Sequence, residues 1–260
     1  MPENSTIHLR DNPHVTRQEN QAQKFSRTSF YSTTIYLRDT SYVVNQSGDV
    51  LVMLLKGIVP EHLLQQAEAT TAKHMKLALK HASKDDIRGK RIAANFGSYV
   101  EQGGSGKMWV KKAYDWCPDF LNNIHEVGVF VDAVYSSFCV EIAACLEFVP
   151  ESFKLWNSIS QLFWNGSSIS KRHLDFKDLK HSIVLPFGQF KESLVDLTYL
   201  NTCINAERGD LYILNSQNVY HTVIKPDPAR QSFVFINHNC VVQCFVDVDI
   251  SNLFEDLNKL

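Results

Sequence analysis

No run of apolar residues in this sequence approaches the roughly 18 to 20 that a transmembrane helix needs. The first 32 residues also lack the apolar segment of a secretory signal, and most of them are polar. That polarity predicts a flexible N-terminal extension over residues 1–32. We therefore expect a protein that is not associated with membranes, whose folded part starts near residue 33.

The chain also lacks any pair of cysteines spaced as CxxC, although it contains six cysteines. With 260 residues, of which 44% are hydrophobic, it can build a core without disulfides, so we expect reduced thiols and an intracellular protein. Cys240 and Cys244 lie close to His238, as half of a zinc site would. The alternating apolar residues around them favour a strand instead.

A strong net charge is absent as well, because the formal total is only −2. The charge is nevertheless unevenly distributed. Residues 73–112 contain ten Lys or Arg and three Asp or Glu, a local excess of seven positive charges. Such a segment can contact phosphates, or it can be the solvated face of a helix, and charge alone leaves both interpretations open.

What the sequence does contain is helical periodicity in its first half and short strands in its second half. Apolar spacing predicts helices over 60–81 and 118–146, after a hairpin formed by 43–44 and 50–55. The basic, glycine-rich stretch 88–107 is typical of a surface loop. Strands are predicted, between turn signals, at Leu155–Trp164, Ser182–Phe187, Leu194–Tyr199, Leu211–Leu214, Val219–Ile224, Ser232–Asn237 and Val241–Val248.

This order of elements predicts an α+β fold in which helices flank a β-structure built from short strands. Seven strands at such spacing indicate a sandwich or small barrel. We expect a double-stranded β-helix (jelly-roll) core over about 155–250, with N-terminal helices over 60–150 packed outside it. The length fits a single domain over residues 33–260.

Polar residues in a fixed order within the predicted core suggest a metal site. Two imidazoles and one carboxylate are the ligand set of non-haem Fe(II) oxygenases. His173 and Asp175 are two residues apart, so on an extended segment they point to the same face, and His221 lies in a later strand. A His-x-Asp tripeptide often occurs by chance, and His221 alone could be a core residue. The ordered set favours Fe(II) bound by His173, Asp175 and His221.

Arg230 and Ser232 follow the second histidine and suggest a cosubstrate with a carboxylate. Arginine presents a rigid fork of N–H donors that matches a carboxylate, and serine adds one hydroxyl donor. We therefore expect these two residues to bind the far end of 2-oxoglutarate, and O2 to take an open position on the metal.

The segment Arg230–His238, RQSFVFINH, resembles the R-x-S-x-V-F-x-x-H signature of the TET/JBP oxygenases, in a compact microbial or fungal form. The resemblance covers about residues 155–240. It implies oxidation of the methyl group of 5-methylcytosine or thymine in nucleic acid, with DNA as partner and a nuclear location in a eukaryotic host. It also implies that His238 and Asp178 contact the base, and Asn95, in the basic stretch, is a third candidate.

Two details bear on the substrate base. Family members often have an aromatic residue where this sequence has Ile236, so stacking would have to come from elsewhere, and Phe96 and Tyr99 are candidates. At Asp178 a carboxylate accepts from the cytosine N4 amino group and opposes the O4 acceptor of thymine. We therefore expect 5-methylcytosine, although Asp178 could instead be a turn residue and His238 a polar residue at a strand end.

Two other interpretations remain open at this point. The first is a 2-oxoglutarate-dependent hydroxylase that acts on a protein side chain or a small molecule. The second is a binding domain that has lost catalysis. The complete ligand set speaks against the second, because a binding domain does not need both histidines, the aspartate and the arginine.

Overall fold

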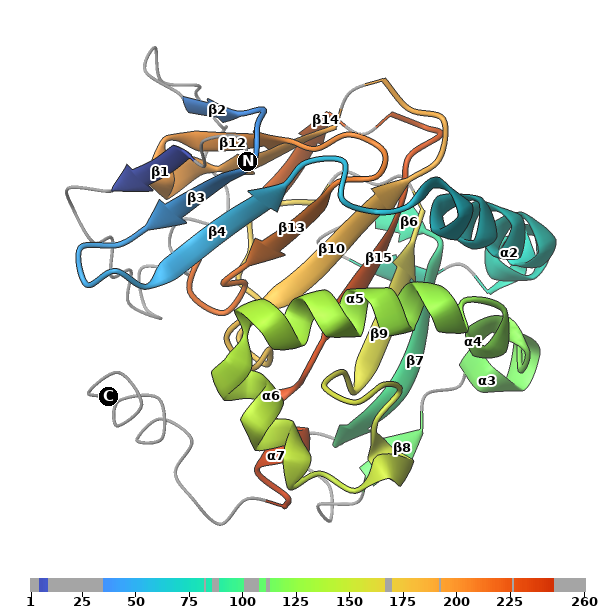
Figure 1. Cartoon of the computed structure of the whole chain (residues 1–260). Helices are drawn as coiled ribbons and strands as arrows, with labels where there is room; N and C mark the ends of the chain where they lie inside the picture. Colours follow the sequence, from blue (N-terminus) through green and yellow to red (C-terminus); the bar gives the residue numbers. More distant parts are fainter. Residues whose placement is uncertain are drawn as a thin grey trace.

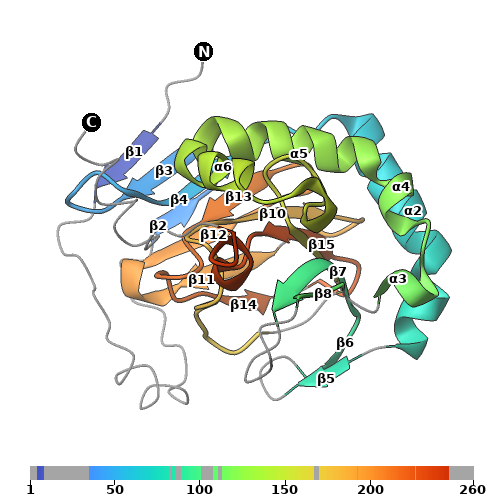
Figure 2. The same cartoon turned by 90° about the horizontal axis from the view of Figure 1, so that it is seen from below.

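The computed structural model describes residues 5–8, 35–81, 83–85, 89–100, 108–110, 113–166, 170–191, 193–225 and 227–245. A large sheet forms the centre of the molecule, with helices over one face and a smaller sheet over the other (Figures 1 and 2). The helices are α2 (Glu61–Lys80), α3 (Ala113–Trp116), α4 (Phe120–Asn123), α5 (His125–Phe138), α6 (Val140–Glu147) and α7 (Asn239–Val242). The predicted α+β class is confirmed.

The strands form two facing sheets and one separate hairpin. The large sheet contains, in spatial order, β1 (Ser5–His8), β3 (Ser41–Val44), β4 (Val50–Leu55), β13 (Leu211–Leu214), β10 (Ser182–Phe187), β15 (Gln231–Ile236), β9 (Gln161–Asn165), β7 (Ala93–Val100) and β8 (Met108–Val110). The small sheet contains β14 (Thr222–Lys225), β11 (Leu194–Leu197), β12 (Thr202–Asn205) and β2 (Ile35–Leu37), and β5 (Ser83–Asp85) pairs with β6 (Gly89–Arg91). Two sheets of mostly antiparallel strands confirm the jelly roll.

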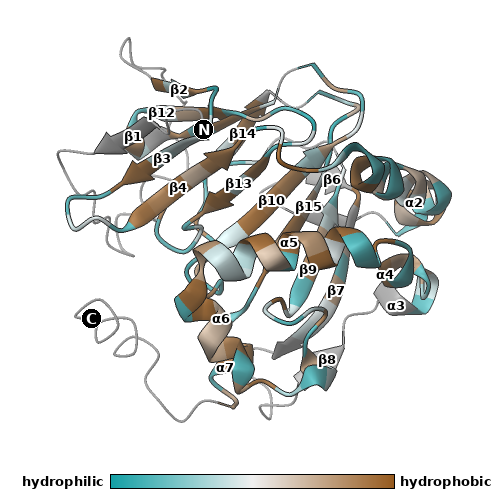
Figure 3. Cartoon of the chain, viewed as in Figure 1, coloured by the Kyte–Doolittle hydropathy of each residue, from teal (hydrophilic) through white to brown (hydrophobic). Residues whose placement is uncertain are grey.

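Alternation along the central strands builds two separate cores. In β15, Phe233 and Phe235 are fully buried in the cluster under the helices, whereas Val234 packs with the cluster between the two sheets. Figure 3 shows that β4, β13 and β10 are largely hydrophobic, as expected for strands covered on both faces. Because the helix-side core carries the large aromatic rings, the other face of the same strands is available to line a cavity.

Helix α2 begins and ends as predicted, and it is anchored to the strand region. Pro60 precedes its first turn, which carries Glu61, and its buried face packs against the large sheet. The Arg208 guanidinium, from the loop between β12 and β13, donates to Glu61 and Glu68 at 2.6 to 3.2 Å. These contacts fix the helix against the end of the jelly roll.

The predicted surface loop over 88–107 is wrong for most of its described residues. Residues 93–100 form strand β7, which pairs antiparallel with β9 and widens the large sheet. Gly97 permits this pairing, because its φ is +101° and a Cβ there would lie 2.1 Å from the Ser160 carbonyl oxygen. Glycines that indicate a loop in the sequence therefore serve a close approach between strands.

Other elements also differ from the prediction. The strands expected at 155–164 and 219–224 begin later, at Gln161 and at Thr222. The strand expected at 241–248 is helix α7 followed by a turn up to residue 245, and residues 246–248 lie outside the described residues. Val241 and Val242 are both buried there, so their apolar character reflects burial rather than strand alternation. The long helix expected over 118–146 is divided into α4, α5 and α6, with a bend of 112° between α5 and α6.

No single described helix is long and apolar enough to cross a membrane; by length and composition, only the bent pair α5–α6 passes that test, when its halves are taken together. Of the expected N-terminal extension, Ser5–His8 are described, and they form a strand parallel to β3 in place of a flexible chain. The division at residue 32 otherwise falls outside the described residues and stays a prediction.

Candidate active site

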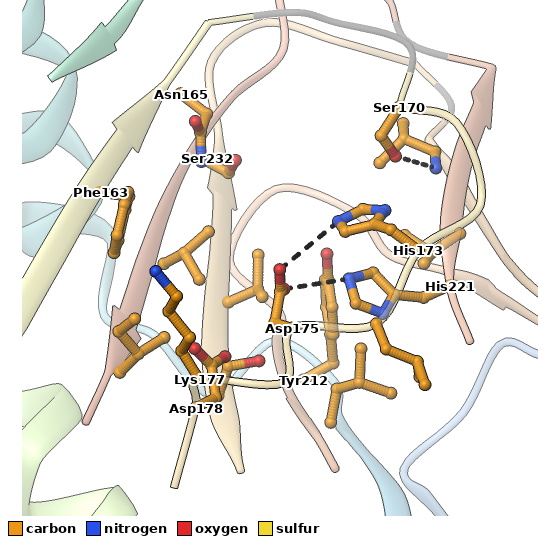
Figure 4. Close-up of a pocket in the computed structure, with 18 of the residues that line it drawn as sticks. Phe163, Asn165, Ser170, His173, Asp175, Lys177, Asp178, Tyr212, His221 and Ser232 are labelled. Atoms are coloured by element: carbon orange, nitrogen blue, oxygen red, sulfur yellow. Dashed lines mark hydrogen bonds and ion pairs between the residues drawn. The ribbon is translucent and has the colours of Figure 1, made fainter. Parts of the chain in front are cut away.

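Three predicted metal ligands meet in a cavity beside β14, the edge strand of the small sheet. One possible ligand atom from each of His173, Asp175 and His221 lies within 4.8 Å of the others. The Asp175 carboxylate is 3.8 Å from His173 Nε2 and 3.4 Å from His221 Nε2 (Figure 4). Two imidazoles and a carboxylate this close together can hold a divalent metal ion.

The backbone fixes both histidines in one arrangement. His173 and His221 exchange two N–H···O bonds of 3.1 Å in an isolated antiparallel bridge, which sets their rings side by side. Each ring has Nδ1 close to a carbonyl oxygen two residues earlier, at 2.8 Å from Lys171 and 3.0 Å from Val219. An Nδ1–H donated to those carbonyls leaves the Nε2 lone pair of each ring directed at the metal position. These residues therefore fit a metal.

Arg230 is buried in the same cavity with part of its hydrogen-bonding capacity unused. It is 4% exposed, and its Nε has no hydrogen-bond partner among the residues that the structure describes. The phenol of Tyr212 is its electrostatic and hydrogen-bond neighbour, and burial raises the pKa of that phenol, so the tyrosine stays neutral. A buried guanidinium of this kind requires an anion, and a carboxylate matches its geometry. Arg230 and Ser232 thus fit 2-oxoglutarate.

The two residues expected to contact a base are also brought together. Asp178 and His238 form an isolated backbone bridge, and His238 Nε2 lies 3.8 Å from Asp178 Oδ1. The Ser216 hydroxyl donates to Asp178 Oδ2 at 2.7 Å and so orients the carboxylate. The backbone N–H of Asp178 also donates to the Asp175 carbonyl oxygen. Asp178 therefore stabilises a turn and lines the cavity at the same time.

Asn95 lies on β7 rather than in a loop. It is directly opposite Phe163 of β9, so both side chains belong to the same face of the sheet. Its Oδ1 is buried and has no hydrogen-bond partner in the described part of the chain. Asn95 does not itself line the cavity but supports a residue that does.

A cavity of about 480 Å³ connects these groups. It lies between the sheets and includes the three candidate metal ligands, Arg230 and Ser232 at one side, and Asp178 and His238 at the other. The lining also includes residues that were not singled out in the sequence, among them Phe163, Asn165, Lys177 and Tyr212 (Figure 4). Three of them lie on strands whose pairing with β15 or β10 the sequence does not reveal.

The strand that carries Arg230 has the two faces that its alternation predicts. Ser232, Val234 and Ile236 line the cavity, whereas Phe233 and Phe235 face the helix-side core. Of the stacking candidates named from the sequence, Phe96 is fully buried in that core and cannot reach a ligand in the cavity. The side chain of Tyr99 lies outside the described part of the chain.

No protein-family model matches the sequence, and no curated protein matches it either. Among solved structures, "NgTET1 in complex with 5mC DNA" superimposes with a TM-score of 0.65 at 18% identity, covering 79% of each chain. A prolyl-4-hydroxylase from Pseudomonas putida gives 0.42 at 13% identity, over 72% of this chain and 91% of that one. A 2OG-Fe(II) oxygenase family oxidoreductase from Burkholderia pseudomallei gives 0.41 at 13%, over 89% and 95%. The likeness to the NgTET1 structure shows that this chain shares the fold of that protein, a double-stranded β-helix.

Proposed function

We propose that this protein is an Fe(II)- and 2-oxoglutarate-dependent dioxygenase that oxidises the methyl group of 5-methylcytosine in DNA. The observation that carries the proposal is the meeting of His173, Asp175 and His221 with the buried Arg230 in one cavity. The metal ligands account for iron, and an arginine with an unused donor accounts for a dicarboxylate cosubstrate.

The bound iron and 2-oxoglutarate would supply the oxidising chemistry, with O2 as the oxidant. The protein's own contribution is to hold these groups and the substrate. His173, Asp175 and His221 would hold the metal, and Arg230 and Ser232 would bind the far carboxylate, in a cavity that lies between the two sheets.

The choice of 5-methylcytosine is supported by Asp178 and His238. A base must leave the duplex to reach a metal between two sheets, and its exposed edge then needs hydrogen-bonding partners. The Asp178 carboxylate, oriented by Ser216, can accept from the cytosine N4 amino group. The same carboxylate opposes the O4 acceptor of thymine, so it disfavours a thymine substrate.

Oxidation of matched duplexes that contain either 5-methylcytosine or thymine at one position tests this choice. Nucleosides are quantified by mass spectrometry after incubation with iron and 2-oxoglutarate. We expect oxidation of 5-methylcytosine to be roughly 5- to 150-fold faster than oxidation of thymine, because one good base contact contributes roughly 1–3 kcal/mol of discrimination. In Asp178→Asn the amide can also donate to the thymine O4, so the two oxidation rates should differ less. Equal rates on both duplexes with the wild-type protein would contradict the assignment.

A further inference from the structure

Strand β9 turns one aromatic ring into the cavity. Its residues alternate: Leu162 and Trp164 are fully buried in the helix-side core, whereas Phe163 and Asn165 line the cavity. Phe163 is only partly buried and belongs to neither of the two hydrophobic clusters. An aromatic side chain held at a cavity wall instead offers a flat apolar surface to a ligand.

The neighbours of Phe163 place it near Asp178 and His238, the side of the cavity proposed to hold the base. In the strand register it lies opposite Val234 of β15 and opposite Asn95 of β7. Its ring centroid is 6.5 Å from that of His238, one of the two residues expected at the base edge. Figure 4 shows Phe163 across the cavity from His173 and His221, with Asp178 between them in this view.

The other aromatic residues near the cavity are not suited to the same task. Tyr212 is engaged with Arg230, at the side that would hold 2-oxoglutarate. Phe176 is 51% exposed, so it lies mostly in solvent at the rim. Phe233 and Phe235 belong to the opposite face of β15, where the cavity side carries Ile236 instead.

We infer that Phe163 is the residue on which the flipped base stacks, and that β9 therefore supplies the aromatic surface that β15 lacks at Ile236. This inference rests on the proposed function. Phe163 would stack on the face of the base, while Asp178 and His238 would form hydrogen bonds to its edge. It is thus a specificity-determining residue that selects a planar ring, and it has no part in holding the metal or the cosubstrate.

Conservative substitutions test this role directly. Phe163→Leu keeps most of the apolar volume and removes the ring, whereas Phe163→Tyr keeps the ring. Stacking of one base on an aromatic side chain corresponds to roughly a five- to hundredfold effect. We expect Phe163→Leu to lower the rate on methylated DNA by that factor through a higher KM, and Phe163→Tyr to stay within about threefold of wild type. Phe148→Leu, at an exposed position after α6, is the matched control.

Two further measurements distinguish stacking from packing. DNA-independent conversion of 2-oxoglutarate to succinate should be unchanged in Phe163→Leu, since the metal and cosubstrate positions are untouched. The double variant Phe163→Leu/Ile236→Phe, which moves the ring to the adjacent strand, should recover a large part of the lost rate.

The outcomes separate the two proposals. A Phe163→Leu protein that oxidises methylated DNA as fast as wild type overturns the stacking role alone. Loss of succinate formation in Phe163→Leu, with no recovery in the double variant, also overturns it, because the residue would then be structural. A wild-type protein that forms succinate but never oxidises methylated DNA refutes the proposed function, and the stacking role with it.

Discussion

At the scale of single residues, the geometry of the candidate metal site is set by the backbone. His173 and His221 come from segments 48 positions apart, yet each donates its N–H to the other's carbonyl oxygen. The carbonyls of Lys171 and Val219 select the ring tautomer that leaves Nε2 to the metal. Backbone hydrogen bonds therefore fix the positions of both imidazoles.

Replacement of His221 by alanine should abolish turnover without unfolding the protein. The imidazole is partly exposed to the cavity, so its removal costs little packing but takes away one of three ligands. We expect succinate formation to fall by more than about 100-fold and iron binding to be lost, with a melting temperature close to that of the wild-type protein. His62→Ala, at an exposed position on α2, should change neither quantity. A variant that retains iron-dependent turnover would exclude His221 as a ligand.

Arg230→Met should maintain or raise the melting temperature without 2-oxoglutarate, and should remove the stabilisation that 2-oxoglutarate gives the wild-type protein. A buried cation with an unused donor destabilises the empty protein, so methionine should maintain or raise its melting temperature. In the wild type, 2-oxoglutarate at about 100 times its Kd should add about 2.7 kcal/mol of stability. Thermal unfolding with and without the cosubstrate measures both effects. If 2-oxoglutarate still raised the melting temperature of Arg230→Met by the same amount, another residue would have to bind its far carboxylate.

At the scale of elements, the pairing of β7 with β9 depends on Gly97. Its positive φ and the 2.1 Å approach of a Cβ to the Ser160 oxygen both oppose a side chain. Gly97→Ala should therefore destabilise the fold by several kcal/mol. Gly48→Ala shares the positive φ but meets no atom within 4 Å, so it should cost only about 1 kcal/mol. Chemical denaturation measures the free energy of unfolding of both variants. Equal losses of stability in Gly97→Ala and Gly48→Ala would show that the β7–β9 contact tolerates a side chain.

The buried His181, directly before β10, predicts a pH dependence of stability. His181 Nε2 lies 3.1 Å from the Val50 carbonyl oxygen of β4, and burial lowers the pKa of His181 to about 4. The unfolded chain binds the proton near pH 6.5, so stability is complete above that pH and falls as the pH drops from about 6.5 to about 4. The slope contributed by this group is at most about 1.4 kcal/mol per pH unit.

Denaturation midpoints between pH 7 and 4.5 test this expectation. His181→Gln keeps a donor for Val50 but does not titrate, so the pH dependence in this window should be reduced. His62→Gln, at an exposed position, should leave it unchanged. If the loss of stability on acidification is the same in all three proteins, His181 is not its source.

At the scale of the whole molecule, the sequence predicts most local features, such as helices and the order of the site residues. It predicts less well which strands pair with one another. The helix at Glu61–Lys80 follows from its periodicity, and the order of His173, Asp175, His221 and Arg230 indicates their chemistry. Phe163 is different. Its place in the cavity follows from antiparallel pairing with both β7 and β15, contacts between segments about 70 positions apart. No local pattern encodes such a contact.

The two cores of the molecule explain how a stable fold leaves room for a cavity. Helices α2 and α5 cover one face of the large sheet with a cluster rich in aromatic rings. Smaller side chains fill most of the space between the sheets, and the cavity of about 480 Å³ remains at one side. The aromatic core and the cavity thus lie on opposite faces of the same strands.

Oxidation of 5-methylcytosine by this protein should be coupled to consumption of 2-oxoglutarate. The most direct test is to measure succinate and oxidised cytosine together, with iron, 2-oxoglutarate, O2 and a methylated duplex. We expect one succinate for each oxidation of the methyl group, above the amount formed without DNA, and no oxidised base in Asp175→Ala or when iron is removed. Succinate without any oxidised cytosine, or oxidised cytosine that does not require 2-oxoglutarate, would contradict it.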